Sequence, residues 1–171
     1  FRRVLFRSGF LTPDAITDNR ATSKHIKSFQ SICLDIDSGD TDEIMARAEA
    51  EVGPVSAEIW SGGVTETGQA KLHLYWRLDE LTERWGDIGI IRDGLALELD
   101  GDPSFKRPTQ VIRVPGTVHG KGGKASQCRI ERSQDVPGLS VDSLLRAWGA
   151  RQAAMEPSAA PSGISARAGA G

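Results

Sequence analysis

Two aspartates, Asp35 and Asp37, lie at the end of the apolar-rich run 31–34 and are the first candidates for a functional site. Successive side chains of a strand point to opposite faces, so the two aspartates share one face, with Leu34 and Ile36 buried on the other. Two carboxylates this close repel each other, and desolvation adds to the cost. A divalent cation between them removes the repulsion, and carboxylate oxygens suit hard ions such as Mg²⁺ or Mn²⁺. The alternative is a pair of solvated aspartates at a strand end.

A second group of polar residues lies on the expected strand at 71–78, where Lys71 and His73 alternate with apolar residues. Both side chains face the same way, which is costly unless an anion such as a triphosphate lies over them. Ser61 and Gly62 open a glycine-rich loop that ends at Gly68, and its backbone amides could approach a phosphate closely. The alternatives are a structural histidine and an ordinary hairpin loop.

A third carboxylate and a basic segment follow further along the chain. Asp102 would complete a two-metal site if it reached the first pair, while Asp100 is the alternative and could simply belong to a turn. Arg113 projects from a short strand, and the turn at 115–116 leads into a loop that contains Lys121. Flexible backbone combined with point charges is suited to phosphate binding. The alternative is a solvated hairpin tip.

The composition of the 171 residues, 39% hydrophobic and 26% charged, is typical of one soluble globular domain. The sequence has no apolar run of transmembrane length and no signal peptide, so we expect no membrane partner and a cytoplasmic location. The net charge is −2, but residues 35–58 hold eight acidic and one basic side chain, and residues 100–132 hold seven basic and three acidic. This asymmetry predicts a metal-binding acidic edge that faces a phosphate-binding basic edge, or else an ordinary dipolar surface.

The elements that must position these residues follow from hydrophobic periodicity and capping signals. The pattern predicts, in order, a strand at about 29–36, a helix at 40–52, strands at 55–61 and 71–78, a helix at 82–99, strands at 110–114 and 127–131, and a helix at 141–152. Asp40 and Thr82 are the expected N-caps, and the second helix should pack through Trp85, Ile88, Ile91 and Leu95. This order is the split βαβ arrangement. It predicts an α+β fold with helices on one face of a mostly antiparallel sheet, and the other face free for the site.

The expected domain lies at 9–150, with its core at 28–132. Residues 1–8 lack periodicity, and 4–8 resemble the translation of a sequencing-library adapter, so we expect a non-native leader there. Residues 151–171 are rich in Ala, Gly, Ser and Pro and are expected to form a truncated linker.

Three separated blocks, in this order, resemble the archaeo-eukaryotic primase superfamily, specifically the RepB-like primase-polymerase domains of plasmids, phages and integrated elements. The resemblance covers about residues 28–132 and rests on the blocks 33–40, 61–76 and 110–123, together with the Gly101-Asp102 pair.

The resemblance implies a catalytic sheet like that of RNA-recognition domains and a metal-dependent nucleotidyltransferase. In such a site two divalent ions, Mg²⁺ or Mn²⁺, are bound by Asp35, Asp37 and Asp102, and His73 contacts the phosphates of the incoming nucleotide. The basic segment of the family matches 113–116. The implied partners are single-stranded DNA, nucleoside triphosphates and a C-terminal helicase domain or subunit.

The sequence departs from the family at two positions, and two other functions stay open. Many relatives have serine where this chain has Lys71, and His119 stands where asparagine is usual. One alternative is a catalytically inactive nucleic-acid-binding module, which would use aromatics on the free face, where only Tyr75 is expected. The other, a replication-initiator nickase, needs a His-x-His metal site and a tyrosine nucleophile, whereas the three histidines here are far apart.

Overall fold

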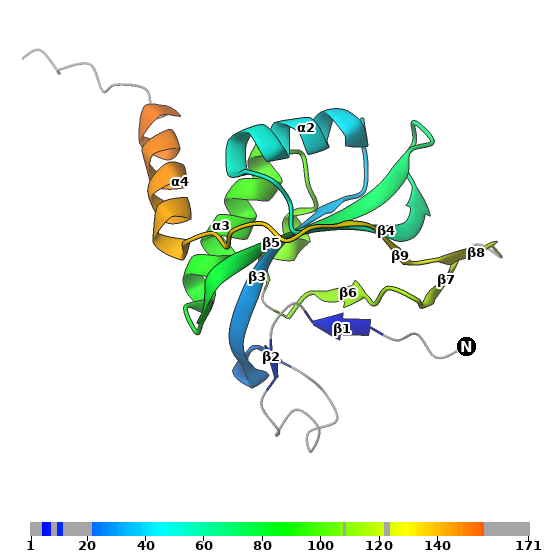
Figure 1. Ribbon diagram of the computed structural model, residues 1–171, viewed down its shortest axis with the longest axis horizontal. Coiled ribbons are helices and arrows are strands. Elements are labelled where there is room, and N and C mark those ends of the chain that lie inside the picture. Colours follow the sequence, from blue (N-terminus) through cyan, green and yellow to red (C-terminus); the bar gives the residue numbers. More distant parts are fainter. Residues whose placement is uncertain (1–4, 8–9, 12–21, 108, 122–123, 156–171) are drawn as a thin grey trace, which may run out of the picture.

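A five-stranded antiparallel sheet organises the chain. The computed structural model describes residues 5–7, 10–11, 22–107, 109–121 and 124–155 (Figure 1). The sheet order is β2-β3-β5-β4-β9, formed by β2 (Phe10–Leu11), β3 (Ile26–Ile36), β5 (Ala70–Thr82), β4 (Ala57–Val64) and β9 (Arg129–Ser133). Two smaller antiparallel pairs join β1 (Leu5–Arg7) to β6 (Val111–Arg113) and β7 (Val118–Lys121) to β8 (Lys124–Gln127).

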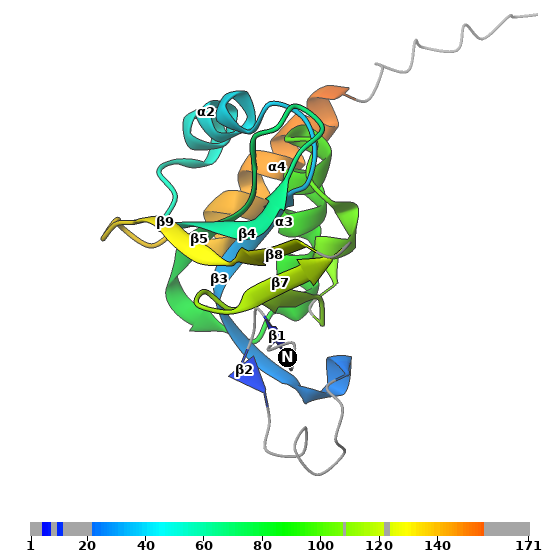
Figure 2. The same ribbon diagram turned by 90° about the vertical axis from the view of Figure 1, so that its right-hand side faces the viewer.

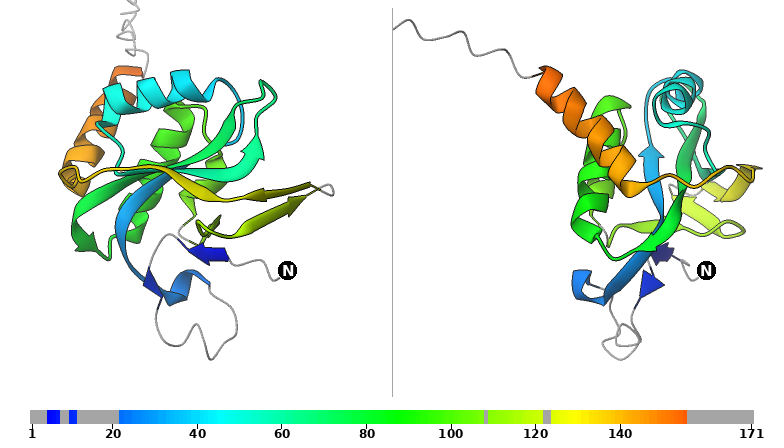
Figure 3. Two further views of the ribbon diagram at one scale, coloured as in Figure 1. Left: turned by 45° about the vertical axis from the view of Figure 1, so that its right-hand side comes forward. Right: turned by 60° about the vertical axis from the view of Figure 1, so that its left-hand side comes forward.

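Three helices cover one face of this sheet: α2 (Thr41–Val52), α3 (Trp85–Glu98) and α4 (Val141–Met155) (Figures 1 and 3). Two short 3-10 helices, η1 (Ser23–His25) and η2 (Pro103–Lys106), complete the described elements. The main core lies between the helices and the sheet and includes Ile32, Leu34, Ile36, Leu72, Leu74, Trp76, Ile44, Ile88, Ile91, Leu95, Leu144 and Trp148. The alternating apolar residues of β3 and β5 therefore face the helices, as predicted, and the α+β fold with helices on one face is confirmed.

The helix caps agree with the sequence at α2 and differ at α3. The Asp40 carboxylate accepts hydrogen bonds from the backbone N–H groups of Asp42 and Glu43, both at 3.1 Å, and so caps α2 as predicted. Thr82 is not the N-cap of α3, because it still pairs with β3 as the last residue of β5. The helix starts only at Trp85, whose side chain is 59% exposed, so its predicted place in the core is wrong.

The last strand of the sheet lies at a different edge from the one expected for a split βαβ unit. The central order β3-β5-β4 agrees with that arrangement, but β9 pairs with β4, and the short β2 occupies the edge of β3. The chain reaches β9 through η2, β6 and the β7–β8 hairpin, which contacts β4 (Figure 2). The expected hairpin loop at 62–68 is also shorter, because β4 continues to Val64 and the turn closes with Thr65 N–H donating to Gln69 C=O at 2.8 Å.

The face opposite the helices is only partly free, which corrects the prediction of an open face. Cys33, Phe105 and Ile112 form a second, small core there, and Tyr75 packs against it. Cys33 and Cys128 are both free and buried. Asp35, Asp37, Lys71 and His73 therefore lie at one end of this face, where β3 ends and β5 begins.

The ends of the chain differ in part from expectation. Residues 5–7, expected to lie outside the fold, form β1 and pair with β6. The last helix extends to Met155, into the segment expected to be a linker, and residues 156–171 lie outside the described part of the chain. Among the described residues, no helix has the length and apolar character needed to cross a membrane.

The contact between α3 and α4 depends on the absence of a side chain at Gly94. A Cβ placed there would overlap the indole of Trp148, which is 4% exposed. We expect Gly94→Ala to lower the free energy of unfolding by about 1–3 kcal/mol, because the ring must move. Gly86→Ala is the matched control, since a Cβ at Gly86 in the first turn of α3 would meet no neighbouring atom within 4 Å. Urea denaturation measures both, and equal stabilities would contradict this packing.

Candidate active site

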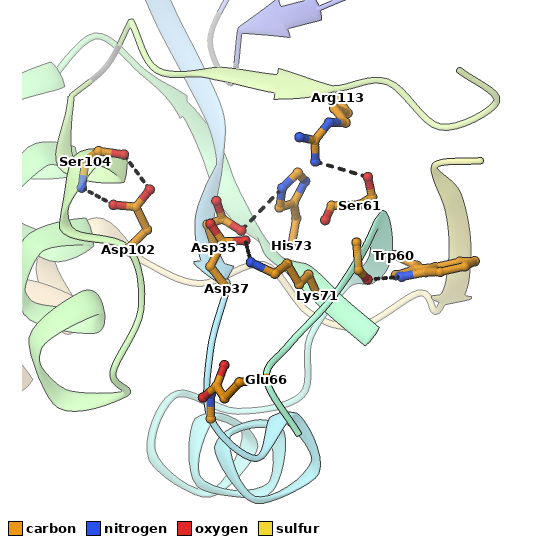
Figure 4. A network of polar contacts seen from close by, with 12 residues as sticks. Asp35, Asp37, Trp60, Ser61, Glu66, Lys71, His73, Asp102, Ser104 and Arg113 are labelled. Atoms are coloured by element: carbon orange, nitrogen blue, oxygen red, sulfur yellow. Dashed lines mark hydrogen bonds and ion pairs between the residues drawn. The ribbon is translucent and has the colours of Figure 1, made fainter. Parts of the chain in front are cut away.

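The register between β3 and β5 places the first acidic residues beside the basic ones. Asp35 lies opposite His73, and the next pair, Ile36 and Leu72, is buried in the main core. A shift by one residue would turn these apolar side chains toward solvent, so the core fixes the register. Asp35, Asp37, Lys71 and His73 consequently share the face away from the helices, as predicted (Figure 4).

Asp102 reaches this face because α3 ends in a tight turn against the end of β3. Asp100 adopts φ +53°, and Gly101 N–H donates to Ala96 C=O at 2.9 Å. Asp102 N–H then donates to Asp35 C=O at 2.9 Å. A Cβ at Gly101 would collide with Leu34 and lie 3.1 Å from the Asp35 carbonyl oxygen, so only glycine allows this approach.

Asp102, rather than Asp100, is the third carboxylate of the cluster. Its oxygens accept hydrogen bonds from Ser104 N–H at 2.8 Å and Ser104 Oγ at 2.7 Å, which orients the side chain (Figure 4). Asp100 is exposed and pairs instead with Arg47 of α2, at 3.4 Å. Ser104 was not predicted from the sequence, although the order Asp102-Pro103 is a recognisable start of a short helix.

The spacing of the three carboxylates is compatible with a bound divalent ion. Asp35, Asp37 and Asp102 each offer an oxygen, and these oxygens lie within 4.8 Å of one another. One octahedral Mg²⁺ spans about 4.2 Å between opposite ligands, so the group fits one ion after a small side-chain adjustment, or two ions that share ligands. Asp35 Oδ1 is buried without a hydrogen-bond partner, and His73 Nε2 lies 3.4 Å away from it. The donor set and this unpartnered oxygen both fit a hard cation.

The electrostatics of the metal-free site follow from burial and like charge. Desolvation, followed by the charges of Asp37 and Asp102, raises the pKa of Asp35 to about 8. Burial, with a smaller contribution from Arg113, lowers the pKa of His73 to about 4, so the imidazole is neutral at pH 7. The metal-free site therefore holds a proton that a cation would displace.

Two cations border the carboxylates. Lys71 Nζ lies 3.3 Å from Asp37 Oδ1, and Arg113 Nη1 donates to the Ser61 carbonyl at 3.1 Å (Figure 4). Ser61 Oγ and His73 Nδ1 are buried and have no hydrogen-bond partner. With Asp35 Oδ1 of β3, unpartnered polar atoms therefore lie on three neighbouring strands, in the same region as the two cations (Figure 4). Such atoms are candidates for contact with a polar ligand.

The remaining predicted residues, Gly62 and Lys121, are not shown in contact with the carboxylate cluster. Gly62 lies within β4 and adopts φ +91°, a conformation that favours glycine. The backbone of Lys121 ends β7 and pairs with Lys124 across the hairpin, while its side chain lies outside the described residues. Glu66, which the sequence did not single out, accepts from Gly39 N–H at 2.8 Å and ties the β4–β5 turn to the loop after Asp37.

Comparison with known proteins supports the fold. No family model and no curated protein matches the sequence. Among solved structures, the primase-polymerase (PrimPol) AEP domain of cyanophage S-2L is 18% identical and gives a TM-score of 0.60. The match covers 81% of this chain and 77% of the S-2L domain. Primase RepB' is 13% identical over 79% of this chain and 43% of its own (TM-score 0.57). The RepB' catalytic domain in complex with initiator DNA is 16% identical over 80% and 67% (TM-score 0.56). The chain therefore shares the fold of the S-2L PrimPol AEP domain and of the RepB' catalytic domain.

The elevated pKa of Asp35 has a measurable effect on stability. Its folded-state pKa of about 8 lies above the ordinary value of 3.8. The contribution of Asp35 to the free energy of unfolding is therefore fully present below about pH 4, where the carboxyl is protonated in both states. This contribution is lost as the pH rises through about 8. Asp35→Asn removes the buried charge, so we expect the metal-free variant to be about 1–2 kcal/mol more stable than wild type at pH 8.5, with no gain at pH 4. Asp100→Asn is the exposed control and should change stability little. Denaturant unfolding with EDTA present measures all three, and an Asp35→Asn variant less stable at pH 8.5 would contradict the assignment.

The same proton predicts how divalent cations bind. Because binding must displace it, Mn²⁺ affinity should rise about tenfold per pH unit between pH 6 and 7 and level off above about pH 8. His73 does not contribute in this range, since its pKa is about 4. Electron paramagnetic resonance of free Mn²⁺ measures the affinity. An affinity independent of pH from 6 to 8 would contradict a protonated Asp35.

Proposed function

We propose that this chain, with the fold of primase-polymerase domains, is a metal-dependent nucleotidyltransferase that synthesises primers on a DNA template. The observation that carries the proposal is the convergence of Asp35, Asp37 and Asp102 within 4.8 Å, on the sheet face that the helices leave uncovered. Three carboxylates brought together at a cost in repulsion are explained by cation binding. The fold supports the reaction class by analogy, and the geometry of the site supports it independently.

In the proposed site the three carboxylates would hold two divalent ions, Mg²⁺ or Mn²⁺. When bound, such ions lower the pKa of an attacking 3′-hydroxyl and neutralise charge on a leaving pyrophosphate. The chain's own carboxylates position the ions, and the reaction requires no nucleophile from the protein. Ser104 and the Asp102–Asp35 backbone hydrogen bond keep Asp102 oriented toward the pair.

The basic residues would bind the triphosphate. Lys71 and Arg113 lie at the rim of the carboxylate cluster, and both could neutralise charge on the phosphoryl group during transfer. The neutral imidazole of His73 can donate one hydrogen bond to a phosphate oxygen. Ser61 and Gly62 lie on the neighbouring strand β4, where the buried Ser61 hydroxyl has no hydrogen-bond partner in the protein. Lys121, at the end of β7, is proposed as a further phosphate-binding residue.

The proposed partners are single-stranded DNA and nucleoside triphosphates. The β7–β8 hairpin, with Lys121 and Lys124 at its end, projects beside β4 and β9 and could contact the template backbone (Figure 2). We place the domain at 5–155 rather than at the predicted 9–150, because β1 and α4 extend it at both ends and Leu144 and Trp148 belong to its core. We take the Ala-, Gly-, Ser- and Pro-rich residues from 156 onward as a linker toward a helicase domain or subunit. The setting would be the cytoplasm of a cell that carries a plasmid, a phage or an integrated element.

A catalytically inactive nucleic-acid-binding module is the competing function. Such a module would stack bases on exposed aromatic side chains. Tyr75, the aromatic expected on this face, packs on the second core, and its hydroxyl is buried. The same burial argues against a nickase, because Tyr75 is the single tyrosine of the chain and its hydroxyl could not attack DNA.

The decisive experiment compares primer synthesis by wild type and by the double variant Asp35→Asn and Asp37→Asn. Purified protein is incubated with single-stranded DNA, labelled nucleotides and Mn²⁺, and the products are separated by size. We expect the double variant to lose about 1,000-fold or more of the synthesis, since the loss of metal ligands removes several kcal/mol of transition-state stabilisation.

The control is Asp100→Asn, which removes a nearby carboxylate outside the cluster and should retain synthesis. Synthesis that persists in the double variant would refute the assignment of the site. DNA binding by wild type without any incorporation of nucleotide would favour the inactive module.

A further inference from the structure

The ion pair between Lys71 and Asp37 occupies a carboxylate of the proposed metal site. Lys71 Nζ lies 3.3 Å from Asp37 Oδ1, and the two side chains are 29% and 52% exposed. Lys71 lies one position beyond the Ile36–Leu72 pair, so the sheet register places it beside Asp37. Figure 4 shows the ammonium pointing toward the carboxylates of Asp35 and Asp37 rather than away from them.

The neighbouring strand leaves room for the lysine in this position. A Cβ at Gly63 of β4 would lie 2.9 Å from Lys71 Cδ and 3.5 Å from Cγ, so the aliphatic part of the side chain lies directly over this glycine. A side chain at position 63 would require the lysine stem to shift. The absence of a side chain at Gly63 therefore leaves room for the Lys71 stem on its way to Asp37.

We propose that Lys71 is a built-in competitor of the divalent cation: it neutralises the carboxylate cluster in the metal-free protein and must leave Asp37 when the cation binds. This inference rests on the proposed function and goes beyond it. A divalent ion bound to Asp37 would lie a few ångströms from the ammonium, and two positive charges at that distance repel each other strongly. The freed ammonium would then be available to a triphosphate that arrives with the cation.

The consequence is that Lys71 acts in opposite directions on the two ligands. It weakens the binding of a cation on its own and strengthens the binding of the anionic nucleotide. A cation that displaces Lys71 makes the lysine available to the nucleotide, and the nucleotide in turn stabilises the displaced lysine. By linkage, each ligand therefore raises the affinity of the protein for the other. A lysine that only held β3 and β5 together would not produce this opposition, because its loss would disturb Asp37 and weaken cation binding as well.

The test measures Mn²⁺ affinity in the absence of nucleotide, by electron paramagnetic resonance of the free ion at one fixed pH. We expect Lys71→Met to bind Mn²⁺ about 5- to 20-fold more tightly than wild type, since one positive charge has been removed from the cluster. Lys71→Arg retains the charge and should stay near the wild-type affinity. Lys27→Met removes an equal charge from the far end of β3 and should also leave the affinity unchanged.

The outcomes separate this inference from the proposed function. Suppose that wild type binds Mn²⁺ and that Asp37→Asn loses this binding. If Lys71→Met then binds Mn²⁺ no more tightly than wild type, the role of Lys71 is overturned and the metal site remains intact. Absence of Asp37-dependent Mn²⁺ binding in wild type would overturn both. Thermal unfolding without metal checks the fold, and a larger Mn²⁺-induced rise in Tm for Lys71→Met would support the competition.

Discussion

The structure depends on one constraint: three carboxylates are held together on one side of the sheet, against their mutual repulsion. The burial of Ile36 and Leu72 on the opposite side fixes the position of Asp35 and Asp37. The hydrogen bond from Asp102 N–H to the Asp35 carbonyl brings the third carboxylate to the same place. The stability of the main core therefore maintains an arrangement that the charges alone would disperse.

The surroundings of the cluster reduce this cost without removing it. Lys71 neutralises Asp37, and Arg113 lies close enough to His73 to lower its pKa, so the face combines an acidic centre with a basic rim. Burial, followed by the charges of Asp37 and Asp102, still raises the pKa of Asp35 to about 8, so the neighbouring cations offset only part of the cost. This combination of acidic centre and basic rim suits a ligand that brings cations and phosphates together, which is the chemistry of a nucleotide with its metal ions.

Much of this arrangement could be predicted from the sequence because it depends on local rules. Period-two alternation placed Asp35 and His73 on one face, and the Asp40 cap marked the start of α2. The sequence favoured Asp102 as the third carboxylate but left Asp100 open, because the choice depends on the left-handed turn at Asp100 and on contacts between α3 and β3. The edge occupied by β9 and the second core around Cys33 are likewise set by long-range packing, for which the chain carries no local signal.

The most direct test is a crystal structure of the protein soaked with Mn²⁺ and a nonhydrolysable nucleoside triphosphate, with anomalous scattering used to locate manganese. The account predicts anomalous peaks at about 2.0–2.6 Å from oxygens of Asp35, Asp37 and Asp102, with the triphosphate on the side of Arg113. Manganese bound only elsewhere, with these three carboxylates unchanged, would contradict it.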